Sequence, residues 1–158
     1  MKMTFYVFEL KTYQKDVWQR ILQIAFLESD TVIFTKNNPK SKVSLYPRIT
    51  DFVVTEFQSD YRWFNKQLGS SSFIKVVLNQ LVKGVIMDIE YLDDWIECDL
   101  EDPAFFNKNR LLIWTINHEK LIFIEKVFFD SKVGKIDGLS VSNECIYDIS
   151  DSDFIEKY

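Results

Sequence analysis

The segment from residue 88 to residue 102 holds the densest group of side chains that could bind or react. It contains eight carboxylates, and no Lys or Arg occurs between Gly84 and Phe106. Like charges so close repel one another, and a basic partner relieves that repulsion. Tyr91 and Trp95 lie among the acids and are residue types that anchor interfaces. The sequence therefore predicts a surface for a basic protein, made of Asp88, Glu90, Tyr91, Asp93, Asp94, Trp95, Glu97, Asp99, Glu101 and Asp102. The alternative is a solvated acidic loop whose aromatic residues pack on the sheet.

A divalent metal is a second ligand that these carboxylates could hold. Asp88 and Glu90 share one face if their segment is a strand, and Asp93 and Asp94 could join them. The glycine of an EF-hand loop is missing, and no lysine stands at the spacing used by metal nucleases of the restriction type. Glu125 and Lys126 are adjacent, so they would point to opposite faces of a strand. We therefore expect no metal and no cofactor.

Other catalytic patterns have no local support in the sequence. His118 is the only histidine, and no Ser or Cys stands beside it to form a nucleophile pair. Cys98 and Cys145 lack CxxC spacing and are expected to be free thiols. The four glycines, at positions 69, 84, 134 and 138, form no phosphate-binding loop. We expect a binding protein rather than an enzyme.

Charge is divided unevenly along the chain of 158 residues. Residues 1–83 carry 12 Lys and Arg against 7 Asp and Glu, whereas residues 84–158 carry 7 against 17. An acidic half disfavours nucleic acid and anionic lipid as partners, because phosphate contacts need Lys or Arg. No run of 18 apolar residues and no signal-peptide pattern occurs, so we expect a cytoplasmic protein that does not span a membrane.

A long hairpin over residues 111–129 is the element that must position these side chains. Residues 111–116 and 121–129 are rich in aromatic and β-branched residues, and the polar loop 117–120 joins them. The first run is apolar at nearly every position, which predicts cover on both faces. Glu125 and Lys126 indicate that one end of the second run reaches solvent.

Around this hairpin we expect one α+β domain, residues 1–158, with a largely antiparallel sheet and two or three helices packed on it. Strands are predicted at 4–10, 31–35, 43–46 and 85–91, with a short strand or two within 136–149. Helices are predicted at 12–27, capped by Thr12, at 58–68, and at 73–83, where Gly84 ends the helix. Residues 37–41 and 131–135 fit turns, and 92–109 is expected to be irregular. Residues 49–57 fit either a helix or a strand.

In size, charge and general layout the chain resembles the immunity proteins that bacteria keep beside their polymorphic or contact-dependent toxins. The resemblance rests on no diagnostic motif. It implies a non-catalytic protein that binds a cognate basic toxin, often a nuclease, and blocks it. Two alternatives remain open: a phage or mobile-element inhibitor that mimics DNA with its carboxylates, and a small hydrolase or nuclease whose site is not visible in sequence.

Overall fold

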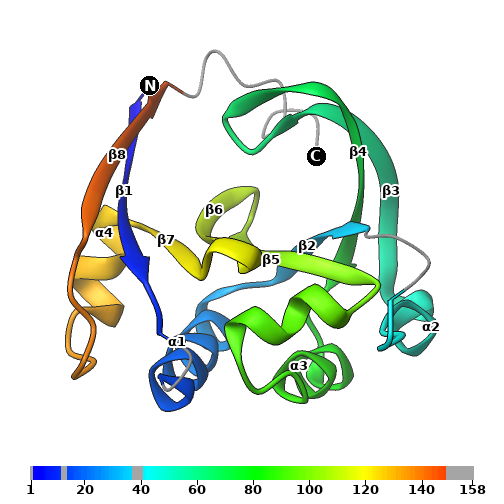
Figure 1. The fold of residues 1–158 in the computed structure, drawn as a ribbon, viewed down its shortest axis with the longest axis horizontal. Coiled ribbons are helices and arrows are strands. Elements are labelled where there is room, and N and C mark those ends of the chain that lie inside the picture. Colours follow the sequence, from blue (N-terminus) through cyan, green and yellow to red (C-terminus); the bar gives the residue numbers. More distant parts are fainter. Residues whose placement is uncertain (1, 12–13, 37–40, 149–158) are drawn as a thin grey trace.

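The computed structural model describes residues 2–11, 14–36 and 41–148. These residues form an α+β fold with one antiparallel sheet of eight strands, in the order β3-β4-β2-β5-β6-β7-β1-β8 (Figure 1). The strands are β1 Lys2–Glu9, β2 Thr31–Lys36, β3 Val53–Arg62, β4 Asn65–Val77, β5 Leu100–Asn107, β6 Arg110–Ile116, β7 Leu121–Glu125 and β8 Asn143–Asp148. The helical segments are α1 Lys15–Glu28, α2 Tyr46–Ile49, η1 Thr50–Phe52, α3 Gln80–Met87, η2 Leu92–Glu97, η3 Asn117–Glu119, α4 Lys126–Phe128 and η4 Phe129–Val133.

The predicted central hairpin is confirmed as β6 and β7, which lie side by side near the middle of the sheet. Trp114 pairs with Phe123, and their rings stack with centroids 3.7 Å apart. The loop is the short helical turn η3. The second strand ends at Glu125 rather than at residue 129, because the Glu125 carboxylate accepts the N–H groups of Val127 and Phe128 and begins α4.

One face of the sheet is covered by α1, α3 and η2 (Figure 1). The predicted helix over 12–27 is confirmed as α1, which buries Trp18, Ile21, Leu22 and Ala25. The expected cap, Thr12, lies outside the described residues, as does most of the predicted turn at 37–41. No helix among the described residues is long and apolar enough to cross a membrane.

The described residues contain more strand than the sequence predicted. They also contain more helical segments than the two or three helices expected. The helix predicted at 58–68 is wrong, because these residues belong to β3, the β3–β4 turn and β4. The helix predicted at 73–83 is wrong up to Val77, which ends β4, and only its last residues are helical, in α3 from Gln80. Burial alternates along β3 with the period of a strand, and Phe57 stacks on Phe73 across the pair with centroids 5.4 Å apart. This pairing also decides residues 49–57, which begin in α2 and η1 and continue as strand from Val53.

Four more predicted segments need correction. The strand at 85–91 is wrong: α3 runs through Gly84 to Met87, capped at its start by the Asn79 side chain. At 43–46, Val43 makes only an isolated bridge to Cys98 before α2 begins at Tyr46. The segment 92–109 is irregular only at first, since Leu100–Asn107 is strand β5. Within 131–135, the first residues continue the helical segment η4, and the described turn follows it.

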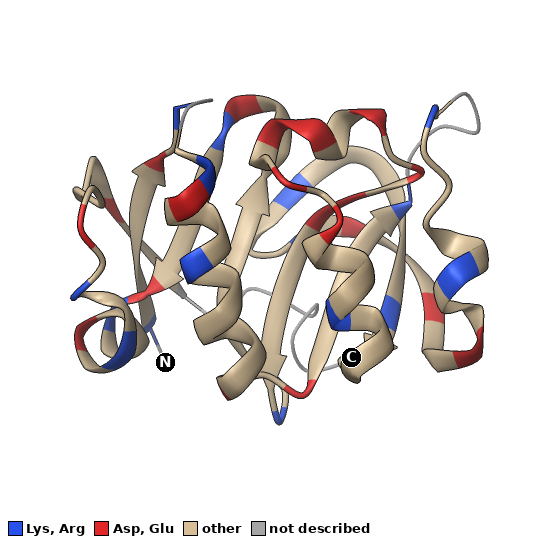
Figure 2. Cartoon of the chain, turned by 90° about the horizontal axis from the view of Figure 1, so that it is seen from below, with Lys and Arg blue, Asp and Glu red and all other residues tan. Residues whose placement is uncertain are grey.

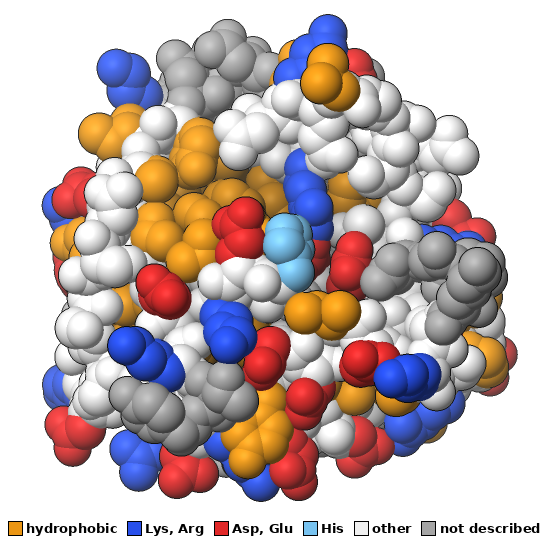
Figure 3. All heavy atoms as spheres, viewed as in Figure 1, with side chains coloured by type: hydrophobic (Ala, Val, Ile, Leu, Met, Phe, Trp, Pro, Cys, Tyr) orange, Lys and Arg blue, Asp and Glu red, His pale blue; other side chains and the backbone are white. Residues whose placement is uncertain are grey.

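The other face of the sheet is concave, because the sheet curls so that β1 and β8 rise on one side and β3 and β4 on the other (Figure 1). Aromatic side chains line this concave face. Trp63, in the β3–β4 turn at φ 56°, is fully buried and lies 6.3 Å from Trp114 between ring centroids. Figure 3 shows this hollow as a recessed apolar area. Hydrophobic clusters therefore form on both faces of β6 and β7, which explains their nearly unbroken apolar sequence.

Candidate binding surface at the loop end of the central hairpin

The acidic segment lies at the loop end of the hairpin, where η2 packs against η3. It follows the end of α3, passes through η2 and enters β5. Because η2 is a 3₁₀-helix with about three residues per turn, its neighbouring side chains point in different directions. The structure therefore divides the predicted residues between the surface and the interior.

Four exposed or half-buried carboxylates of the segment form ion pairs with bases from elsewhere in the chain. The pairs are Asp88–Arg48 at 2.8 Å, Glu90–Lys15 at 2.9 Å, Glu97–Lys42 at 3.3 Å and Asp93–Lys120 at 3.9 Å. Figure 2, which looks onto the helices, shows Lys and Arg positions among the acidic ones. Three of the four bases come from residues 1–83, so folding brings the basic half of the sequence against the acidic half.

Asp99 binds backbone groups of the fold, and Glu101 is half-buried. Asp99 accepts the N–H groups of Leu45, at 2.6 Å, and Tyr46, at 3.1 Å, and so satisfies backbone donors at the start of α2. Glu101 is half-buried, and burial raises the pKa of its carboxyl group against the opposing effect of Arg62. Neither residue projects from the surface as a free carboxylate.

Asp102 is fully buried and cannot belong to an exposed interface. Its backbone lies in the left-handed region, at φ 49°. Its carboxylate pairs with Arg62 and accepts the N–H of Asn117 at 2.7 Å. Asn117 in return accepts the N–H of Asp102 and donates to the carbonyl of Leu92 at 2.9 Å. This network ties β3, β5, η2 and η3 together.

Trp95 is also fully buried, which corrects its predicted role as an exposed anchor. It stacks on Phe34 of β2 with ring centroids 5.7 Å apart. The apolar side chain that η2 exposes is Ile96, with 46% of its surface accessible. The sequence analysis did not include Ile96, because it assigned the role of exposed anchor to the neighbouring Trp95. Tyr91 remains half-exposed, 5.8 Å from the Lys15 ammonium.

Asp94 is the exposed acid of η2 whose charge is least compensated. No ion pair to it occurs among the described residues. Partial burial raises the pKa of its carboxyl group, and the charge of Asp93 raises it further, with smaller effects of Glu90 and Glu97. We call the exposed group formed by Tyr91, Asp93, Asp94, Ile96 and Glu97 the η2 surface.

The remaining candidates for chemistry do not assemble into a site among the described residues. No group of three or more His, Cys, Asp or Glu in that part of the chain could hold a metal ion. The His118 side chain is 57% exposed, 3.8 Å from the carboxylate of Glu119, as expected for a loop residue. Cys98 and Cys145 form no disulfide in the part of the chain that the structure describes, and burial raises the pKa of Cys98 to about 12, which disfavours the reactive thiolate.

Comparison with protein-family models, with curated proteins and with solved structures found no match.

Proposed function

We propose that this protein is a non-catalytic binding protein that holds a basic partner protein on the η2 surface. The observation that carries the proposal is Asp94, an exposed carboxylate crowded by Asp93, Glu90 and Glu97. A cation brought to Asp94 by a partner relieves this crowding. Ile96 beside it offers apolar area that a partner can bury.

The existing ion pairs around Asp94 do not oppose this role. Those of Asp88, Glu90 and Glu97 join side chains that keep a third or more of their surface exposed. Exposed pairs of this kind contribute about 0–1 kcal/mol each. The cations of a partner can therefore replace Lys15, Lys42 or Arg48 at little energetic cost.

The class of partner is inferred from the resemblance to toxin-immunity proteins. A toxin that acts on nucleic acid presents a basic active-site surface, which an acidic surface attracts over distances of about a Debye length. We therefore propose a basic toxin domain as the partner. The protein product of a neighbouring toxin gene is the first candidate to test.

Binding kinetics test this proposal with the purified candidate toxin domain. Reversing Asp93, Asp94 and Glu97 to Lys should slow association and flatten its dependence on salt, because electrostatic steering acts on the association rate. Ile96→Ala should instead speed dissociation. Surface plasmon resonance at two salt concentrations measures both rates.

A matched control changes the same number of charges elsewhere. Asp51, Glu56 and Asp60 are exposed acids on η1 and β3, and their reversal to Lys alters net charge by the same amount. If the control variant slows association as much as the η2 variant, the effect belongs to net charge and the proposed surface is wrong.

A further inference from the structure

The opposite end of the central hairpin contains a gap in the sheet. β7 pairs with β1 only from Phe5 to Glu9 and with β6 only from Ile113 to Ile116. β1 continues to Lys2 and β6 begins at Arg110, so Lys2–Thr4 and Arg110–Leu112 have no partner in β7. We call the space between these two stretches the β1–β6 gap.

The gap begins where β7 leaves the sheet. The chain turns into α4 at Glu125, whose carboxylate accepts the Val127 and Phe128 N–H groups. Where β7 lies between them, β1 and β6 are two strand spacings apart, roughly 10 Å. A pocket of about 520 Å³ lies beyond the end of β7, and its lining includes Lys2, Met3, Thr4, Lys108, Leu111 and Val127.

The backbone of β1 offers hydrogen-bonding groups to this gap. Leu10 donates to Lys120 on the β7 side, whereas Val7 accepts from Ser142 on the β8 side. Because the two sides alternate along an antiparallel strand, the N–H and C=O groups of Lys2 and Thr4 point towards the gap. An extended segment placed in the gap would therefore face backbone N–H and C=O groups of β1, as β7 does where it pairs with Phe5–Glu9.

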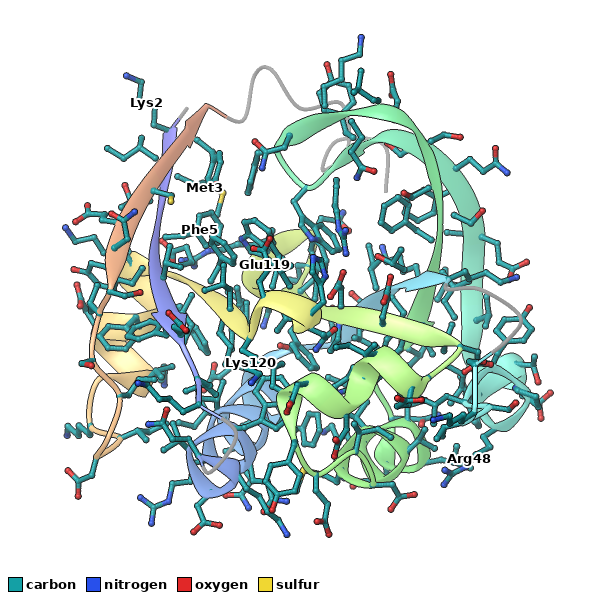
Figure 4. The ribbon with its side chains drawn as sticks, viewed as in Figure 1. Lys2, Met3, Phe5, Arg48, Glu119 and Lys120 are labelled. Carbon is teal, nitrogen blue, oxygen red and sulfur yellow. The ribbon has the colours of Figure 1, made fainter. Side chains whose placement is uncertain are left out.

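The charge around the gap selects the kind of segment. Its lining holds four cationic side chains and one carboxylate. That carboxylate, Glu125, is already paired with Arg110 at 2.7 Å. Within the described residues, the ammonium groups of Lys2 and Lys108 form no ion pair. Figure 4 shows Lys2 directed outwards, while Met3 and Phe5 point towards the hollow.

From these observations we propose that the β1–β6 gap binds an acidic, extended segment of another protein, which adds a short strand between β1 and β6. Backbone hydrogen bonds to Thr4 and Lys2 hold the strand. Acidic side chains at its ends meet Lys2 and Lys108, and apolar ones meet Met3, Leu111 and Val127. This site is separate from the η2 surface, which lies at the other end of the same hairpin.

A labelled synthetic peptide in which Glu alternates with Val tests the proposal by fluorescence polarisation. We expect it to bind the wild-type protein, and to bind the double variant Lys2→Glu, Lys108→Glu at least about tenfold more weakly. The double variant Lys66→Glu, Lys83→Glu carries the same charge change on β4 and α3, away from the gap, and should bind nearly as well as wild type. Equal losses in the two variants would overturn the proposal.

Two further probes separate strand addition from simple charge attraction. A peptide with Pro at its central positions keeps the charge but lacks the N–H groups that a strand needs, and it should not bind. In the wild-type protein, hydrogen exchange at the Thr4 amide should slow when the alternating peptide binds. Unchanged exchange at Thr4, or equal binding of the Pro peptide, would overturn the proposal.

A second copy of the chain is the other possible occupant. Sedimentation at increasing protein concentration detects this case, since the η2 surface of one copy could meet the gap of the next. If the wild-type protein self-associates and the double variant Lys2→Glu, Lys108→Glu does not, the occupant is another copy and the proposal of a foreign segment is wrong.

Discussion

At its loop end, the β6–β7 hairpin packs against η2, and a buried network of Asp102, Arg62 and Asn117 fixes the contact. At its other end, β7 leaves the sheet at Glu125 and strand edges of β1 and β6 face open space. The loop end presents acids on its surface, whereas the other end presents bases. One hairpin therefore carries both of the surfaces proposed above to bind partners, the first beside a buried polar network and the second at an incomplete sheet edge.

The difference follows from where the polar groups lie. Buried polar groups must find partners inside the protein, and at the loop end Asp102 and Asn117 bind each other while Asp102 also pairs with Arg62. Exposed backbone groups at a strand edge are satisfied by water and can exchange that water for another chain. Each of the following predictions tests one side of this contrast.

The largest effect is expected for Asp102→Asn. Asparagine keeps the shape of aspartate and tolerates the left-handed backbone, but it leaves the charge of Arg62 unpaired in the interior. We expect a loss of about 3 kcal/mol, the lower end for a broken buried pair, since the Arg62 side chain keeps 25% exposure. Urea denaturation measures the loss.

The double variant Arg62→Met, Asp102→Asn is the control for this prediction. It removes both charges, so it should recover a large part of the lost stability. If Asp102→Asn alone costs less than about 1 kcal/mol, the buried network does not hold the loop end.

A comparison within η2 sharpens the contrast between its buried and exposed residues. Trp95→Ala removes a fully buried ring from its contact with Phe34 and should cost about 3–5 kcal/mol. Ile96→Ala changes an exposed side chain and should stay within about 0.5 kcal/mol of wild type. Thermal unfolding of both variants checks the pair, and similar losses would mean that η2 is placed differently.

A smaller effect is expected at the other end of the hairpin for Glu125→Ala. This change removes the cap of α4 and the pair with Arg110, whose side chain is 52% exposed. Water can replace a partner that is half exposed, so we expect a loss of about 1–2 kcal/mol. A loss in urea denaturation equal to that of Asp102→Asn would remove the distinction between the two ends.

The smallest effect concerns Asp94 and depends on pH. The folded protein raises the pKa of this carboxyl group above its unfolded value, so ionised Asp94 disfavours folding. Asp94→Asn should therefore stabilise the free protein at pH 7, by no more than about 0.5 kcal/mol.

As the pH falls, Asp94 takes up a proton and the advantage of Asn should shrink, vanishing below the ordinary pKa of 3.8. Melting temperatures at several pH values measure it. The same variant should weaken binding of the basic partner. A variant that is less stable than wild type at pH 7 contradicts this account of Asp94.

The predictions succeeded for segments in which the hydrophobic pattern of the sequence matches the side chains that the fold buries. The hairpin β6–β7 and helix α1 are strongly patterned, and each buries the face that its period predicts. The helix predicted at 58–68 failed because Phe57, Phe64 and Leu68 approach helical spacing, while a cross-strand contact such as Phe57 on Phe73 cannot be seen in a local sequence pattern. Gly84 failed as a stop signal because glycine is tolerated within a helix at a cost of about 1 kcal/mol.

The sequence by itself determined the apolar hairpin strands β6 and β7, the acidic composition of residues 88–102 and the absence of familiar catalytic spacings. Only the tertiary structure decided which acids remain free. It placed Arg48, Lys15 and Lys42 beside Asp88, Glu90 and Glu97, and buried Trp95 and Asp102. The β1–β6 gap could not be predicted from the sequence either, because it lies between strands that are far apart in the chain. The physical reason is that composition follows from local sequence, whereas the compensation of a charge or a backbone group depends on its neighbours in space.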